Sequence, residues 1–395
     1  MNFAQRMNRL GTENAFEVLA EVKKLEAMGK DIISFAIGEP DFNTPEHIKE
    51  ACIKAIRDNH THYGPSAGIL ALREMIAEYI TKTRKLPCHS DEVVVTAGAK
   101  PIIYFVIHAL VNPGDEVIYP TPGFPIYESV INFVGGVPVP AVLLEEHSFT
   151  FDIDSLRELV TPKTKLIILN SPQNPTGGML TKKDLEAIAE LAISNDLWVL
   201  ADEIYSRIVY DGDFVSISSI PGMKDRTIIL DGFSKTYAMT GWRIGYGVMN
   251  ETLARYITRL VMNSESCTNT FIQHAAIAAL TGPQNDVQAM VQEFHARRDL
   301  IVDGLNSIKG IHCQVPKGAF YVFPNVTEAC RNLGLETGKD LQHHLLYNAH
   351  VAVLPRTSFG AKDNREIGEF VRFSYATSRE NIELGLKRIK EALER

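Results

Sequence analysis

Apolar side chains recur with a helical period in the first part of the chain. Residues 14–29 repeat them close to every 3.6 positions, and Gly29 supplies a stop signal. Similar patterns occupy residues 46–58 and 68–84, separated by a segment that contains Gly and Pro. The pattern therefore predicts three helices in this part of the chain.

From residue 93 the pattern changes to short apolar runs that alternate with helical segments. The runs are VVVTAG (93–98), EVIYP (116–120), KLIILN (165–170), LWVLAD (197–202) and TIILDG (227–232). Nearly all-apolar strands separated by helices are typical of a mainly parallel sheet covered on both faces. We therefore predict an α/β fold.

Polar clusters directly follow four of these strands. They lie at residues 98–100, 170–174, 202–205 and 232–235. Ligands of open parallel sheets bind beyond the carboxyl ends of the strands, which share one edge of the sheet. We expect the four clusters to converge at that edge.

Beyond residue 285 the pattern indicates a second, smaller α+β domain. It begins with a long helical pattern at about 286–308. Strand-like runs follow at 319–324, 351–355 and 369–377. A chain of 395 residues is longer than the length that one hydrophobic core of ordinary size can organise. We expect a large domain at 47–285 and a small domain formed by residues 1–46 and 286–395.

Composition and charge narrow the class of protein. The chain is 45% apolar and 22% charged, as soluble globular proteins are, and its net charge of −8 argues against a nucleic-acid partner. Five scattered cysteines fit a reducing cytoplasm, and neither a signal peptide nor a run of ~20 apolar residues for a membrane span is found. The pairs His60/His62 and His343/His344 lack further ligands at metal spacing, so we expect a cytoplasmic protein without a metal site.

The segment DGFSKTYAMTGWRIGYG, residues 231–247, places Lys235 in a glycine-flanked turn and Arg243 eight residues later. Most lysines near turns are solvated charges. A lysine at a strand end, however, can have a shifted pKa and act as a nucleophile. The choice between these interpretations depends on the residues at the other strand ends.

Each of those residues has an ordinary explanation beside a functional one. Asp202 ends a buried strand, where it either caps the next helix or pairs with a cation. Tyr205 is packing or a ligand to an oxygen, and Arg243 is a surface ion-pair partner or a two-pronged phosphate ligand. Gly98 begins a tight turn or an anion-binding helix start, and Asn174 lies in a rigid Pro/Gly loop.

Taken together, these residues meet the demands of one cofactor, pyridoxal phosphate. It needs a lysine for a Schiff base, a carboxylate for the ring nitrogen, an arginine and backbone amides for the phosphate, and a hydroxyl for the ring oxygen. The joint occurrence at adjacent strand ends favours the functional interpretation.

Six segments also resemble the signature segments of one family. They are AIGEPDF, YGPSAG, NSPQNPTG, ADEIY, SKTYAMTGWRIGY and VRFSYATS. Their order resembles that of class I/II aminotransferases, nearest the bacterial and archaeal aspartate/aromatic branch, over nearly the whole chain. The resemblance implies pyridoxal-phosphate fold type I: a mainly parallel seven-stranded sheet between helices in a large domain, plus a smaller α+β domain.

The resemblance implies a role for each residue near the cofactor ring. Lys235 would form the Schiff base and shuttle the proton between Cα and C4′. Asp202 would keep the ring nitrogen protonated, Tyr205 and Asn174 would bind the phenolic oxygen, and Phe124 would stack on the ring.

At the phosphate, the resemblance assigns Arg243, the amides of Ala99 and Lys100, and Ser234. Many relatives carry a serine three residues before the lysine, where this chain has Gly232. One phosphate contact is therefore unassigned.

For the substrate, the resemblance assigns Arg372 to the α-carboxylate, helped by Asn174 and the backbone near Gly38. Tyr63 matches a residue that reaches the neighbouring subunit's phosphate, which implies a homodimer with shared active sites. Candidates for the side-chain pocket are Phe16, Tyr321 and the loop after Gly11, where LGTENAF offers no cation.

The expected activity is a ping-pong transfer of an amino group from an L-amino acid to a 2-oxo acid such as 2-oxoglutarate. Aspartate, aromatic and other neutral donors remain open. β-Elimination or decarboxylation with the same cofactor is the alternative, and a cofactor-sensing transcription regulator is a third hypothesis that lacks a basic DNA-binding segment.

Overall fold

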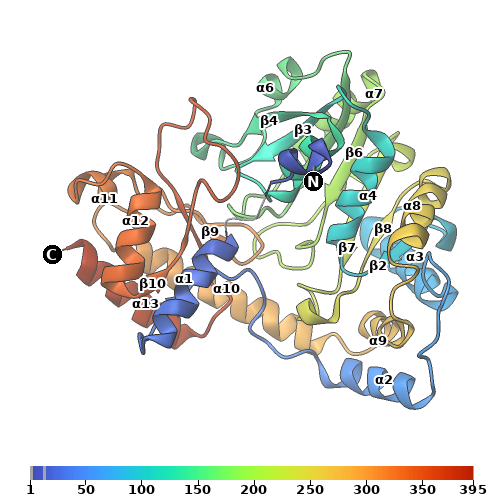
Figure 1. Ribbon diagram of the computed structural model, residues 1–395, viewed down its shortest axis with the longest axis horizontal. Coiled ribbons are helices and arrows are strands. Elements are labelled where there is room, and N and C mark those ends of the chain that lie inside the picture. Colours follow the sequence, from blue (N-terminus) through green and yellow to red (C-terminus); the bar gives the residue numbers. More distant parts are fainter. Residues whose placement is uncertain (1–2, 12–14, 395) are drawn as a thin grey trace.

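A seven-stranded sheet forms the centre of the protein (Figure 1). The computed structural model describes residues 3–11 and 15–394, without the side chains of residues 15 and 16. The strands, in spatial order, are β2 (Val93–Thr96), β8 (Gly245–Val248), β7 (Thr227–Gly232), β6 (Trp198–Asp202), β5 (Thr164–Asn170), β3 (Glu116–Thr121) and β4 (Val137–Val142). β8 is antiparallel to both of its neighbours, β2 and β7, and the other pairs of this sheet are parallel, so the predicted mainly parallel α/β fold is confirmed.

Both faces of the sheet are buried, which explains the nearly all-apolar strands. In β5, Leu166 and Ile168 belong to one core cluster, whereas Ile167 and Leu169 belong to another. Successive side chains of a strand point to opposite faces, so the two clusters lie on opposite sides of the sheet.

Helices of the same part of the chain cover these faces. They are α2 (Glu46–Arg57), α3 (Leu70–Arg84), α4 (Lys100–Leu110), α5 (Ile126–Val134), α6 (Ile153–Glu158), α7 (Lys182–Ser194), α8 (Glu251–Ser264) and α9 (Thr270–Thr281). Short 3-10 turns are η1 (Gln5–Arg9), η2 (Ser90–Glu92), η3 (Glu145–His147), η4 (Ile217–Ser219), η5 (Lys224–Arg226) and η6 (Thr240–Trp242). Across the described ranges 3–11 and 15–394, no helix is both long and apolar enough to traverse a lipid bilayer.

The C-terminal part forms a smaller α+β assembly. Its strands are β9 (Tyr321–Val322), β11 (Leu354–Pro355) and β12 (Val371–Ser374) in one antiparallel sheet, and β10 (Val351–Ala352), which pairs with β1 (Ile33–Ser34). Its helices are α10 (Asn285–Asn306), α11 (Thr327–Asn332), α12 (Gly338–His344), the π-turn η7 (Leu345–Ala349) and α13 (Arg379–Leu393). The N-terminal helix α1 (Ala15–Ala27) lies beside these elements (Figure 1), where Tyr347 donates a hydrogen bond to Glu21. The exact domain limits stay a prediction.

Two strands of the large sheet, β4 and β8, were not predicted, because they lack the apolar runs that mark the other strands. β4 contains two prolines, which lack a ladder donor and are tolerated because β4 is an edge strand. β8 contains two glycines, and a Cβ on Gly245 would lie 2.4 Å from the amide nitrogen of Ala99. The close approach of the backbones therefore excludes the side chains that mark a strand.

A buried charge network lies below the carboxyl ends of β6 and β7. Arg84, at the end of α3, contacts Glu203 at 2.9 Å and Asp231 at 2.8 Å, and all three side chains are almost fully buried. Arg84 also donates to Ser206 at 2.8 Å, and Ser216 donates to Glu203. Burial raises the pKa of Glu203 and Asp231, and the guanidinium partly offsets that rise.

We expect Arg84→Met to destabilise the fold by about 3–5 kcal/mol, because it leaves two buried carboxylates uncompensated. Urea unfolding followed by circular dichroism measures the loss. Arg255→Met is the control: its i,i+4 ion pair with Glu251 is exposed, so its loss costs below about 0.5 kcal/mol. Equal stability of the two variants would contradict the prediction.

Candidate active site

A cavity of about 720 Å³ opens at the carboxyl ends of the parallel strands. All four predicted polar clusters contribute residues to its wall. Every residue assigned above to the cofactor or the substrate lines this cavity, with the exception of Tyr63. Segments far apart in the sequence thus supply one site.

Lys235 follows β7 and points its amine into the cavity. Nζ donates to the carbonyl oxygen of Gly38 at 2.5 Å. Burial lowers the pKa of Lys235 to about 8; Arg372 and Arg243 lower it as well, whereas Glu39 raises it. The amine is therefore partly neutral near physiological pH, as a nucleophile or base must be.

Asp202 is a buried carboxylate at the end of β6. Tyr127, on α5, donates to Oδ2 at 2.6 Å, and the amide of Ile204 donates to Oδ1 at 3.3 Å. Burial raises the pKa of Asp202 to about 6, and the Tyr127 bond opposes that rise. Both contacts come from neutral donors, so the carboxylate retains its capacity to bind a cationic group in the cavity.

Tyr205 and Tyr321 form a second polar group in the wall. Their hydroxyl oxygens are 2.8 Å apart, and both side chains are buried. Tyr321 comes from β9, so the pair joins the large sheet to the C-terminal assembly. Tyr321 is one of the three predictions for the side-chain pocket; it lines the cavity.

Arg372 enters from β12 and lies between the rings of Tyr321 and Phe359, at 4.6 and 5.0 Å from their centroids. It donates to Asn174 Oδ1 at 3.1 Å and to the carbonyl of Ala36 at 2.6 Å. Its buried Nε has no hydrogen-bond partner among the described residues. A buried guanidinium with an unused donor is suited to an anionic ligand.

The start of α4 and Arg243 form a corner of the cavity that is suited to an anion. Ala99 is the N-cap of α4, whose amide dipoles favour negative charge. Arg243 donates to the carbonyl of Thr240 at 2.9 Å, and its guanidinium packs on Gly98 so closely that a Cβ there would lie 2.2 Å from Nη2. Ser234 is buried in the same cavity wall.

Packing explains the glycine at position 232. A Cβ on Gly232 would lie 3.0 Å from the Cα of Gly245 in β8, so a serine there would require β8 to shift by a few tenths of an ångström. The tight contact favours glycine at this position, while the phosphate ligand that replaces the serine stays a prediction.

The remaining predicted residues lie elsewhere. Tyr63 is 89% exposed, as a residue that serves a neighbouring subunit would be in a single chain, and its role stays a prediction. The Phe16 side chain and the loop residues after Gly11 lie outside the described residues.

Pattern analysis missed several residues of the site. Tyr127, which donates to Asp202 from behind the cavity wall, lies three positions after Phe124 on the first turn of α5, and that spacing was its one available signal. Lys23, on α1, and Phe359 also line the cavity, far in sequence from any motif. Lys23 lies outside the segment LGTENAF, so the statement that this segment offers no cation is unchanged.

The fold and the lysine-containing cavity define an enzyme of pyridoxal-phosphate fold type I. The family model for aminotransferase class I and II matches residues 30–389. The chain is 42% identical to the probable aspartate/prephenate aminotransferase of Aquifex aeolicus over 395 residues, covering 99% of this chain and 98% of the relative. It is 40% identical to aromatic-amino-acid aminotransferase 2 of Thermococcus litoralis, with 95% of each chain covered.

Among solved structures, the aspartate aminotransferase of Rhizobium meliloti superposes with a TM-score of 0.94 at 36% identity, covering 100% of this chain and 99% of that one. The chain therefore belongs to the class I and II aminotransferase family. The protein is a transaminase, and the names of its relatives give no support to elimination or decarboxylation.

Because the pKa of Asp202 rises from an ordinary 3.8 to about 6, the fold favours the neutral carboxyl. The stability from this preference is full below pH of about 4 and lost as the pH rises through about 6. We expect Asp202→Asn to stabilise ligand-free protein by up to about 3 kcal/mol at pH 7.5, with the gain shrinking toward pH 4. Urea unfolding at several pH values measures it.

The matched control is Asp154→Asn, because the Asp154 side chain is 89% exposed and its charge is solvated. A pH-independent difference between Asp202→Asn and the wild type would contradict the prediction.

Proposed function

We propose that this transaminase binds pyridoxal phosphate in the cavity. One observation supports this most directly: Lys235, whose pKa is lowered, and Asp202, a buried carboxylate, line the same cavity. Asp202 would hold the ring nitrogen, Tyr205 and Asn174 the ring oxygen, and Phe124 the ring face. The start of α4, Ser234 and Arg243 would hold the phosphate.

When bound, pyridoxal phosphate supplies an aldehyde that reacts with amines and a ring that accepts electrons from the substrate Cα. Lys235 would then take the proton from Cα and deliver it at C4′. Its hydrogen bond to the Gly38 carbonyl holds the amine against the cavity wall. Asp202 would keep the ring nitrogen protonated, because a buried carboxylate favours a cationic partner.

We infer that Arg372 binds the α-carboxylate of every substrate, since the residue and both flanking rings line the same cavity as Lys235 and its guanidinium is not neutralised by a carboxylate among the described residues. The names of the relatives point to acidic and aromatic donors, and we propose 2-oxoglutarate as the acceptor. Lys100 lines the cavity, with its ammonium 5.0 Å from the Phe124 ring centroid, and would add positive charge on the side that receives an acidic side chain. Tyr321 and Phe359 support aromatic side chains.

We also propose a homodimer with shared active sites. The exposed Tyr63 ring is the residue that would complete the partner's phosphate site. A large aromatic ring that is 89% exposed gains by burial at a subunit interface.

Lys235→Ala is expected to lower the transamination rate by at least about 1,000-fold, because no other group moves the Cα proton. Coupled spectrophotometric assay of 2-oxo acid formation measures the rate. Hydride reduction followed by mass spectrometry should attach the cofactor to the peptide that contains Lys235 in the wild type and leave the variant unmodified. Near wild-type turnover in the variant would exclude the proposed role, and Lys163→Ala, in an exposed loop, is the control.

A panel of amino donors tests the substrate proposal. We expect aspartate, glutamate and aromatic L-amino acids to bleach the yellow cofactor fastest. Lys100→Met should lower kcat/KM for aspartate by about 10-fold or more, and for phenylalanine by less than about 3-fold, because only the acidic side chain loses an ion pair. Lys163→Met, in an exposed turn outside the cavity wall, is the matched control. Equal losses for both donors would contradict the assignment.

A further inference from the structure

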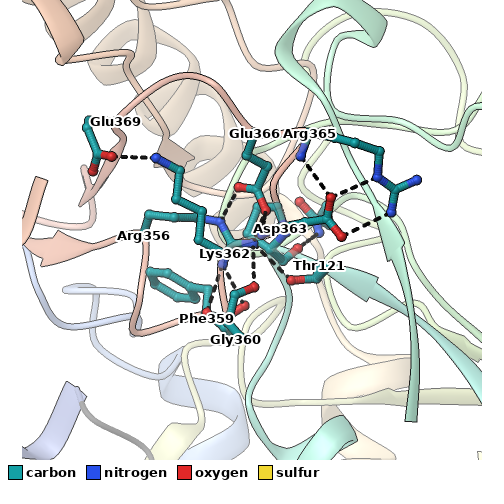
Figure 2. Close-up of polar contacts among 12 residues, drawn as sticks. Thr121, Arg356, Phe359, Gly360, Lys362, Asp363, Arg365, Glu366 and Glu369 are labelled. Atoms are coloured by element: carbon teal, nitrogen blue, oxygen red, sulfur yellow. Dashed lines mark hydrogen bonds and ion pairs between the residues drawn. The ribbon is translucent and has the colours of Figure 1, made fainter. Parts of the chain in front are cut away.

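Arg356 is a second buried arginine next to Arg372. It follows β11, whose Leu354 pairs with Arg372 of β12, and its amide donates to the carbonyl of Phe370 at 3.0 Å. Its side chain is 1% exposed. Unlike Arg372, which has an unused donor, Arg356 directs its guanidinium away from solvent into a dense set of protein acceptors (Figure 2).

The carboxylate of Glu366 neutralises Arg356. Nε and Nη2 contact its two oxygens at 2.6 and 2.5 Å, and Glu366 is itself buried. The guanidinium also donates to the carbonyl oxygens of Phe359, Gly360 and Ala361, at 3.3, 3.0 and 3.2 Å. A single side chain thus holds the loop between positions 357 and 366 from inside.

Arg356 further ties this loop to the large sheet. Nη2 donates to the hydroxyl of Thr121, at the end of β3, at 3.0 Å. Beside it, the amide of Gly123 donates to the carbonyl of Phe359 at 3.0 Å. Thr121 and Gly123 lead to Phe124, so the bonds join the cofactor side of the cavity to the substrate side.

The two sides differ in how firmly they are anchored. The sheet side is fixed by the pairing of β3 with two strands and by Gln173, whose Nε2 donates to the Pro122 carbonyl at 2.6 Å. The loop side carries Ser358 and Phe359, which line the cavity, and Phe359 flanks the Arg372 guanidinium. Weakening the connection should therefore displace the loop and leave Phe124 in place.

We propose that Arg356 is a positioning residue for substrate binding. Neutralised by Glu366, it fixes the Phe359 wall against Thr121 and so holds the neighbouring Arg372 in the orientation that receives the substrate carboxylate. Glu366 also prevents Arg356 from competing for that carboxylate. The inference rests on the proposed role of Arg372 and concerns the substrate, not the cofactor.

Thr121→Val tests the connection with little change of shape. It removes the acceptor for Arg356 and keeps the ion pair with Glu366. The matched control is Thr227→Val on β7, since the Thr227 hydroxyl is buried and has no partner among the described residues. Arg356→Lys is the second variant, because lysine retains the charge but cannot reach the acceptors in a fixed fork.

Steady-state kinetics with aspartate and 2-oxoglutarate, or with the best donor of the panel, give KM and kcat for each variant. We expect Thr121→Val to raise KM for both substrates by about 5-fold or more and to change kcat by less than about 2-fold, because binding of the common carboxylate is lost uniformly. The dissociation constant and the visible spectrum of the cofactor should match those of Thr227→Val. Arg356→Lys should show the same split with a larger rise in KM.

Other outcomes separate the two claims. If the wild type transaminates but Thr121→Val has the same KM as Thr227→Val, the positioning role alone would be overturned. Loss of cofactor affinity in step with KM would also overturn it, because that pattern indicates general disruption. Wild-type protein that transaminates no donor would instead overturn the proposed function.

Discussion

The structure depends on a contrast between two kinds of buried charge around the cavity. Some buried charges are neutralised by other protein groups, and others beside them are not. Below the cavity, Asp202, Glu203 and Asp231 lie within one region, and Arg84 contacts the last two only. On the opposite wall, Glu366 neutralises Arg356, while the adjacent Arg372 keeps an unused donor. In both walls the protein satisfies its internal charges and leaves one group of defined sign facing the cavity, because a buried charge without a partner is costly unless a ligand supplies one.

The large sheet could be predicted from the sequence because parallel strands buried on both faces are apolar at nearly every position. β5 shows this, since its alternate residues enter two different cores. β4 and β8 could not be predicted in that way. The prolines of β4 are tolerated because β4 is an edge strand, and the glycine at 245 in β8 is required by close backbone contact. Neither condition can be read from the sequence before the order of the strands is known.

The cavity residues divide along similar lines. Lys235, Asp202 and Asn174 follow strands, so the rule that ligands bind at strand ends locates them together. Tyr127 bonds Asp202, 75 positions away in the sequence, and Arg356 bonds Glu366 and Thr121, 10 and 235 positions away. No local sequence pattern records such side-chain bonds. Predicting them requires knowledge of which strand lies beside which, and this depends on the whole topology.

The three glycines at 98, 232 and 245 have an evolutionary consequence. A Cβ on Gly98 would lie 2.2 Å from Arg243 Nη2, and a Cβ on Gly245 would lie 2.4 Å from the amide nitrogen of Ala99. A side chain at either position therefore requires another segment to move, whereas a serine at Gly232, 3.0 Å from the Cα of Gly245, requires β8 to shift by a few tenths of an ångström. The residues at these three positions should therefore change slowly in evolution. A lineage that acquires a serine at position 232 should carry compensating changes in β8.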